Sequence, residues 1–271
     1  MKPLFKLLDT FAPSFAAKEM YKVMSNPRQR KLKDFEAEIL DRAQKERFRF
    51  RNFDIQTYAW GEPGNKSAFL IHGWEGHAGN FGALVDILLE KGYYVQAFDG
   101  PSHGQSSRGS TNMFDFADLV ELLLAKYQPR TVISHSFGSV TSVMAMSRNP
   151  QLEIEQFIML TTPHNFKNRI KEVSDFLGLS DRTVSEVVQL LEKETRMPID
   201  EMNMAHYGAK LSHVKEALIV HSKSDKVISI ESARYTHEYL PQSELIELDG
   251  LGHYGILWSE EVKEILGERL E

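Results

Sequence analysis

The sequence predicts an α/β fold, in which helices flank a mostly parallel β-sheet. Short apolar and β-branched runs alternate with helical stretches from residue 67 to the end of the chain, and this alternation is typical of parallel strands joined by crossover helices. Polar and glycine-rich segments follow the strands, where the ligands of such sheets bind. The 271 residues are enough to bury a substantial core, and one domain with an insertion is the simplest organisation.

The composition excludes several classes of protein. The formal net charge is −6 and no segment concentrates lysine and arginine, so nucleic acid is not an expected partner. The absence of cysteine rules out disulfides and thiolate chemistry and permits a cytoplasmic location, which we expect. Asp9, Pro13 and Lys18 interrupt the N-terminal apolar residues, and no apolar run reaches the length of a spanning helix. We therefore expect neither a signal peptide nor a membrane span.

Residues 1–46 lie outside the alternating pattern and are predicted to form an N-terminal helical segment. Apolar residues recur there at helical spacing, at Leu4, Leu7, Leu8 and Phe11. Pro13 interrupts this pattern, and a second short helix is expected over 15–24. The segment is expected to pack against the main domain, with a helix lying on a membrane surface as the alternative. Charges dominate residues 31–47, which predicts a solvated helix face.

The core is predicted to begin with an antiparallel hairpin over 47–58, where apolar and polar side chains alternate, followed by a turn at 61–65. Buried strands are then expected at 67–71, 93–98, 130–133, 156–160, 217–221 and 245–248. The helices between and after them are expected at 81–91, 113–127, 137–147, 230–240 and 259–270.

About fifty residues separate the strand at 156–160 from the next strand, which is too long for a plain connection. Helical periodicity over 166–177 and 180–195 indicates that these residues are structured. We expect a helical insertion at 164–213.

The segment Ser134-His135-Ser136-Phe137-Gly138 stands between a predicted strand and a predicted helix. A serine at such a turn is typical of a nucleophile elbow, whose backbone is strained and whose residues two before and two after the serine must be small. The alternative is a buried serine that caps a helix.

Further motifs follow other strands in a fixed order. His72-Gly73 ends one strand, a block from Asp99 to Ser106 ends the next, and Asp225 and His253 follow the last two strands. With the serine elbow, this order resembles the α/β-hydrolase family, in which the catalytic residues run serine, acid, histidine along the chain. The resemblance covers about residues 48–271, more weakly across the insertion.

The family resemblance implies a domain organisation. The hydrolase core would comprise 47–163 and 214–271, and the insertion at 164–213 would be a helical cap that roofs the active site. The sequence departs from the family pattern at Ser134, where the elbow usually has a glycine.

The reaction that the family resemblance implies requires three side chains. A serine hydroxyl is a weak nucleophile, so Ser136 needs a base, for which His253 is the candidate, and a carboxylate that orients and stabilises the imidazole. Asp225 is placed for that role, and Asp249, four residues before His253, is the competitor. By resemblance, the oxyanion hole would consist of the backbone N–H groups of Trp74 and Phe137.

No metal or cofactor motif is recognised. His72 and His77 are five residues apart on a glycine-rich loop, which does not match a helical zinc motif. The glycine-rich segments lack the lysine and the spacing of a phosphate loop, and no dinucleotide fingerprint is present. We expect chemistry without a cofactor or a metal.

The resulting functional hypothesis is a serine hydrolase, carboxylesterase-like, that cleaves a small-molecule carboxylic ester or thioester through an acyl-enzyme. The alternatives are a carbon–carbon bond hydrolase or an acyltransferase that uses the same triad, and a non-catalytic ligand-binding protein on the same scaffold. The sequence assigns no substrate-binding residues and no oligomeric state.

Overall fold

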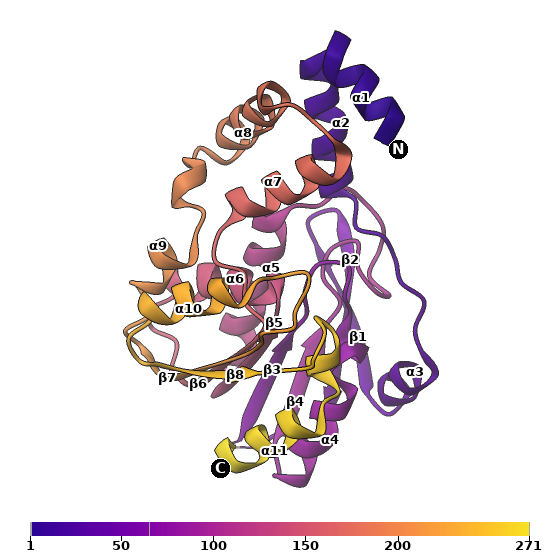
Figure 1. The fold of residues 1–271 in the computed structure, drawn as a ribbon. Coiled ribbons are helices and arrows are strands. Elements are labelled where there is room, and N and C mark those ends of the chain that lie inside the picture. The colour runs from indigo at the N-terminus through magenta and orange to yellow at the C-terminus, as the bar shows by residue number, and fades with distance from the viewer. Residues whose placement is uncertain (1, 65, 271) are drawn as a thin grey trace.

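A computed structural model describes residues 2–64 and 66–270 of the protein and places an eight-stranded sheet at its centre (Figure 1). Its strands are β1 (Gln44–Phe50), β2 (Phe53–Trp60), β3 (Ser67–Ile71), β4 (Tyr94–Phe98), β5 (Thr131–His135), β6 (Ile154–Leu160), β7 (Val214–Ser222) and β8 (Ser243–Leu248). Their order across the sheet is β1-β2-β4-β3-β5-β6-β7-β8. The pairs β1–β2 and β2–β4 are antiparallel and all others are parallel, so the predicted fold class is confirmed.

The helices of the described chain follow the predicted alternation. They are α1 (Lys2–Phe11), α2 (Pro13–Ser25), α3 (Asp34–Asp41), α4 (Gly82–Glu90), α5 (Met113–Tyr127), α6 (Phe137–Ser147), α7 (Phe166–Leu177), α8 (Asp181–Thr195), α9 (Met204–Gly208), α10 (Ile230–Glu238) and α11 (Glu260–Arg269). Short 3-10 turns occur at Ala78–Phe81, Ile199–Glu201 and Gly255–Leu257. The predicted turn at 61–65 joins β2 to β3, and its last residue, Asn65, lies outside the described residues.

Both faces of the sheet are covered, as expected for parallel strands. On one face, Phe69 and Ile71 of β3 belong to an apolar cluster that includes α5, α6 and α10. On the other face, Ala68 and Leu70 belong to a second cluster that includes α4 and α11. Successive side chains of β3 thus enter different cores, which fixes the register of the strand at the centre of the sheet.

The N-terminal helices pack on the insertion between β6 and β7. α2 contacts α8 and α1 contacts α7, and these four helices lie together at the upper end of the molecule in Figure 1. We call them the helical layer. Asp9 joins its two halves, because its Oδ1 accepts hydrogen bonds from Ser180 Oγ at 2.8 Å, Ser180 N–H at 3.0 Å and Thr183 Oγ1 at 2.6 Å. Asp9 therefore ties α1 to Ser180, the residue before α8, and to the side chain of Thr183 in its first turn.

The prediction of a solvated helix face over 31–47 is confirmed for most of its charged residues, which are exposed, and is wrong for Glu36, which is buried, and for the end of the range. α3 covers only part of this range, and β1 begins within it and joins the sheet. Glu36 of α3 is buried, and its carboxylate accepts hydrogen bonds from Asn80 Nδ2 at 2.9 Å and from Lys33 N–H at 2.9 Å. A buried carboxylate is tolerated when such donors replace water, and the sequence pattern does not reveal the partner 44 residues away.

Candidate active site

Ser136 lies at the sharp turn between β5 and α6. Its backbone has φ 55° and ψ −123°, a left-handed conformation that a non-glycine residue adopts only when the surroundings impose it. The Ser136 N–H donates to two carbonyl oxygens at the end of β6, Leu160 O at 3.0 Å and Thr161 O at 2.8 Å. The neighbouring strand therefore holds the turn in its strained form.

The residues two before and two after Ser136 show why the turn needs small side chains. A Cβ atom on Gly138 would lie 2.3 Å from the carbonyl oxygen of Ile71, closer than real contacts allow. Ser134, which departs from the family pattern, is fully buried, and its Oγ lies 3.0 Å from Ser139 Oγ and 3.3 Å from Ile158 O. The hydroxyl is thus accommodated, and the strained elbow conformation forms with serine at this position.

Asp225 and His253 come together from the loops after β7 and β8. His253 Nδ1 lies 2.9 Å from Asp225 Oδ2, and because a carboxylate only accepts, the imidazole nitrogen carries the proton. Asp225 Oδ1 accepts from the N–H groups of Val227 at 2.7 Å and Ile228 at 3.0 Å. Burial alone would raise the pKa of Asp225, but the His253 hydrogen bond and these two N–H groups lower it below its usual value. Neutral His253 therefore has its lone pair on Nε2, as a general base requires.

His135 lies beside Ser136 in sequence and contacts the His253 loop. Its Nε2 donates to the carbonyl oxygen of His253 at 2.9 Å, and the two rings lie 4.9 Å apart. Burial lowers the pKa of His135 to about 3, so it stays neutral. The sequence analysis did not assign His135 a role, because a contact across 118 residues leaves no local pattern.

The loop after β3 runs alongside the nucleophile elbow. A Cβ atom on Gly73 would lie 3.0 Å from Ser136 Cβ, so glycine allows the loop to approach. The rings of Trp74 and Phe137 meet edge to face at 5.3 Å. Phe137 is the first residue of α6, and its N–H has no acceptor within the helix. The two residues expected to contribute the oxyanion hole are therefore neighbours, on opposite sides of the elbow.

His72 stabilises the same loop through two hydrogen bonds to backbone groups. Its Nε2 accepts from Gly100 N–H at 2.9 Å, so its Nδ1 carries the proton that is donated to Gly73 O at 2.7 Å. Asp99, at the end of β4, accepts from Ala78 N–H, Gln105 N–H and Tyr58 Oη. These hydrogen bonds stabilise the loops and do not point to a catalytic role.

An arm from the N-terminal segment also reaches this loop. Arg28 Nε lies 2.8 Å from Glu75 Oε1 and its terminal nitrogen 2.9 Å from Oε2, a bidentate pair. Arg30 lies 3.8 Å from the same carboxylate and 4.3 Å from the ring of Tyr254, the residue after His253. Glu75 follows Trp74 and has φ 60°. No local sequence pattern indicates this arm, because Arg28 lies 47 positions from Glu75 and Arg30 still farther from Tyr254.

The competing acid, Asp249, is placed differently. Its Oδ1 accepts from Gly250 N–H at 2.8 Å and from Ser224 Oγ, which closes the turn after β8. Hydrogen bonds from Ser224 and Gly250 lower its pKa. The structure therefore pairs His253 with Asp225 and gives Asp249 a role in shaping the turn.

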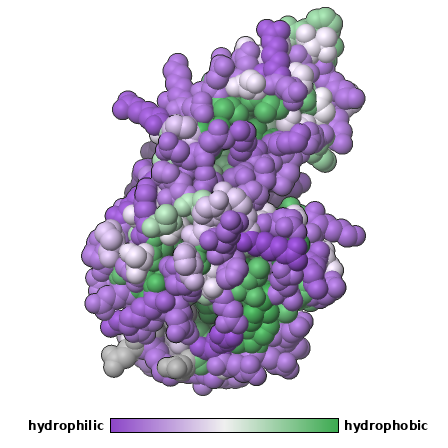
Figure 2. All heavy atoms as spheres, turned by 60° about the vertical axis from the view of Figure 1, so that its left-hand side comes forward, coloured by the Kyte–Doolittle hydropathy of each residue, from purple (hydrophilic) through white to green (hydrophobic). Residues whose placement is uncertain are grey.

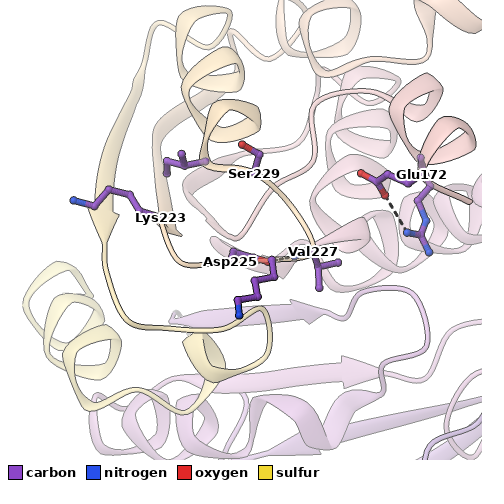
Figure 3. A pocket seen from close by; sticks show the side chains of 8 residues that line it. Glu172, Lys223, Asp225, Val227 and Ser229 are labelled. Carbon is purple, nitrogen blue, oxygen red and sulfur yellow. Dashed lines mark hydrogen bonds and ion pairs between the residues drawn. The ribbon is translucent and has the colours of Figure 1, made fainter. Parts of the chain in front are cut away.

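A pocket of about 560 Å³ opens beside the candidate acid. Figure 3 shows Glu172 of α7 on one side and Asp225, Val227 and Ser229 on the other. Ser136 and His253 are not among its lining residues in the described chain, and each is only 8% exposed. The pocket thus lies between the insertion and the loop after β7, and of the three candidate triad residues Asp225 lines it.

Within 2–64 and 66–270, no group of three histidine, aspartate or glutamate side chains has an arrangement that could hold a metal ion. The helices of these residues are also too short or too polar to cross a lipid bilayer.

The fold and the site together define an α/β-hydrolase with a candidate serine-hydrolase site. At the carboxyl edge of a mostly parallel sheet lie a strained serine elbow, a histidine–aspartate pair and a loop whose glycine allows close approach to the elbow. The family model of the serine aminopeptidases, S33, matches residues 63–206, more than half of the chain. The chain therefore belongs to this family of α/β-hydrolases. The matched range includes Trp74 and Ser136 and ends before Asp225 and His253.

Individual proteins agree with this assignment. A human protein described as serine hydrolase-like is 29% identical over 142 residues, which are 50% of this chain and 68% of that protein. Two solved structures share the fold. The Pyrococcus furiosus esterase Pf2001 is 19% identical, has a TM-score of 0.65 and aligns over 90% of this chain and 95% of its own. The thioesterase domain from the curacin biosynthetic pathway is 16% identical, with a TM-score of 0.61 over 84% and 99% of the two chains. The chain is a serine hydrolase of the α/β-hydrolase superfamily.

Proposed function

We propose that this serine hydrolase cleaves a carboxylic ester or thioester through an acyl-enzyme formed on Ser136. The observation that supports the proposal most is the 2.9 Å hydrogen bond between His253 Nδ1 and Asp225 Oδ2, at the edge of the sheet where the strained backbone of Ser136 also lies. The esterase and thioesterase folds among the solved structures agree with this substrate class.

In the proposed reaction, the Ser136 hydroxyl gives its proton to His253 Nε2 while Oγ forms a bond to the carbonyl carbon of the substrate. The negative charge on the carbonyl oxygen is stabilised by the N–H groups of Trp74 and Phe137. His253 then protonates the leaving alcohol or thiol as its bond to carbon breaks. A water molecule, deprotonated by the same imidazole, releases the acid and restores the serine. Asp225 stabilises the imidazolium in both steps.

The experiment that tests the proposal is labelling of the intact protein with a fluorophosphonate probe, followed by peptide mapping. We expect the label on Ser136, because only an activated serine reacts with such a probe, and we expect hydrolysis of short acyl esters. Ser136→Ala should lose turnover by at least about 10⁴-fold and keep its thermal stability. Labelling of another residue, or ester turnover that survives in Ser136→Ala, would contradict the assignment of the nucleophile.

The same experiment separates the alternatives. A labelled Ser136 with turnover only when an acceptor alcohol or thiol is added would replace the hydrolase with an acyltransferase. The absence of both labelling and ester turnover would favour a non-catalytic scaffold.

A further inference from the structure

The outer face of the N-terminal helices exposes large apolar side chains in a regular row. On α1, Leu4 is 59%, Leu7 57% and Phe11 78% exposed, and their spacing of three and four residues puts them on one face of the helix. Phe15 at the start of α2 is 52% exposed. Phe5 of α1 and Met20 of α2 are buried instead. Phe5 and Met20 therefore form the face through which the two helices pack on the rest of the protein. The exposed apolar side chains form a second face that this packing does not use.

This face lies at one end of the molecule. Apolar side chains appear at the upper tip, the end formed by α1 and α2 (Figure 2). Phe176 of α7 is also exposed, at 58%, and Lys2 Nζ lies 4.5 Å from the centre of its ring. Phe176 and Lys2 thus lie where α1 faces α7, and we call the outer residues Leu4, Leu7, Phe11 and Phe15 the tip surface. Contiguous apolar surface of this kind on a water-exposed end marks a binding site more often than chance.

The net charge of α1 and α2 indicates that the partner is anionic. Residues 2–25 contain four lysines and two acidic residues, which leaves 28 basic and 36 acidic residues for the rest of the chain. Both acids are engaged, Asp9 with the start of α8 and Glu19 with Lys22 at 2.5 Å. Among the described residues, no acid forms an ion pair with Lys2, Lys6 or Lys18. The tip is thus cationic on an otherwise anionic molecule.

From this combination we propose that the tip surface binds the surface of an anionic lipid bilayer. Exposed leucine and phenylalanine rings enter the boundary between headgroups and acyl chains, while lysines attract the negative surface, as in other interfacial helices. Lys18 lies one helical turn from Phe15 and on the same face, where it can contact headgroups. α1 packs on α7, and α7 carries Arg169 and Glu172 at the pocket beside Asp225, so the bilayer would lie near the helix that lines this pocket.

The test is co-sedimentation of the full chain with vesicles of phosphatidylcholine alone or mixed with phosphatidylglycerol. We expect binding to the mixed vesicles that weakens as salt is added, since exposed charges are screened. The triple variant Leu4→Ser, Leu7→Ser, Phe11→Ser should bind at least about tenfold more weakly. The matched control is Leu122→Ser on α5, a leucine that is 45% exposed on another helix, and its binding should not change.

Vesicle binding requires no turnover, so its outcome is independent of the proposed ester hydrolysis. Equal binding by the triple variant and the parent chain, or no binding to the mixed vesicles, would overturn the proposal. Light scattering provides the remaining check. If the parent chain is a dimer and the triple variant a monomer of unchanged thermal stability, the tip surface is covered by a second copy and the lipid proposal is wrong. Circular dichroism of the triple variant shows whether its helices have formed.

Discussion

The carboxyl edge of the sheet and the helical layer are built on different principles. At the sheet edge, Ser136, Asp225 and His253 are each only 8% exposed, and each is held by backbone or side-chain hydrogen bonds. In the helical layer, large apolar side chains face outward, and the contact at Asp9 consists of hydrogen bonds at the surface. Catalysis requires buried side chains that hydrogen bonds hold in place, as at the sheet edge. A surface that adapts to a partner usually belongs to a less stable part of a fold, as in the helical layer.

The largest effect is expected where the sheet edge is most tightly organised. Asp225→Asn preserves the shape of the side chain but replaces a carboxylate oxygen that accepts from His253 Nδ1. An amide nitrogen there would favour the other tautomer of the imidazole and would not stabilise its positive charge. We expect the kcat for an ester to fall about 10⁴-fold, while thermal stability changes little. Asp249→Asn is the control and should retain nearly full activity, and the reverse result would make Asp249 the acid.

Asp225 is a residue that the sequence alone could propose as the acid. Other contacts in the structure could not be predicted in this way. The elbow with Gly138 is a local motif, the order of serine, acid and histidine along the chain came from the family resemblance, and the alternation of strands and helices predicted the fold class. Glu36 looked like a surface charge, because nothing in its own segment indicates Asn80. A side-chain contact between distant segments leaves no periodicity, and the arm at Arg28 and the Asp9 bridge to α8 are of the same kind.

Acid should weaken the sheet edge through its buried histidines. Burial lowers the pKa of His103 to about 4, of His135 to about 3, and of His72 well below its usual range. In the unfolded chain all three titrate near 6.5. Below that pH the unfolded state binds protons that the folded state excludes, so the stability is complete above about 6.5 and is lost as the pH falls toward the folded pKa values. At pH 5.5, one unit below the unfolded pKa, the loss is about 1.4 kcal/mol for each of His103 and His135, and His72 adds to it in the same direction.

Urea unfolding at pH 7.5 and pH 5.5 measures this loss. The free energy of unfolding should be lower at pH 5.5 by roughly 3 kcal/mol for His103 and His135 together, with a further decrease from His72. The same free energy at both pH values would mean that these side chains are accessible to protons in the folded protein, contrary to their burial.

The arm that joins the two regions provides a smaller effect. Arg28 is 82% exposed, so its replacement would ordinarily change nothing. Because it holds both oxygens of Glu75 next to the candidate oxyanion donor Trp74, we expect Arg28→Ala to lower kcat about tenfold with little change in KM. Arg42→Ala is the control, since Arg42 also forms a 2.8 Å ion pair, with Asp86, away from this loop. Equal kinetics in both variants would reduce the arm to a surface contact.

The smallest effect is expected within the helical layer. Asp9→Ala removes the acceptor for Ser180 and Thr183 at the start of α8, and loss of such a hydrogen bond near the surface costs about 1 kcal/mol. Because the sheet does not depend on this contact, we expect faster amide hydrogen exchange in α1 and the first turn of α8 and unchanged exchange in β5 and β7. Asp9→Asn retains an acceptor oxygen and should restore most of the protection. Faster exchange in β5 and β7 as well would show that the helical layer and the sheet unfold as one unit, so that the two regions differ in exposure but not in stability.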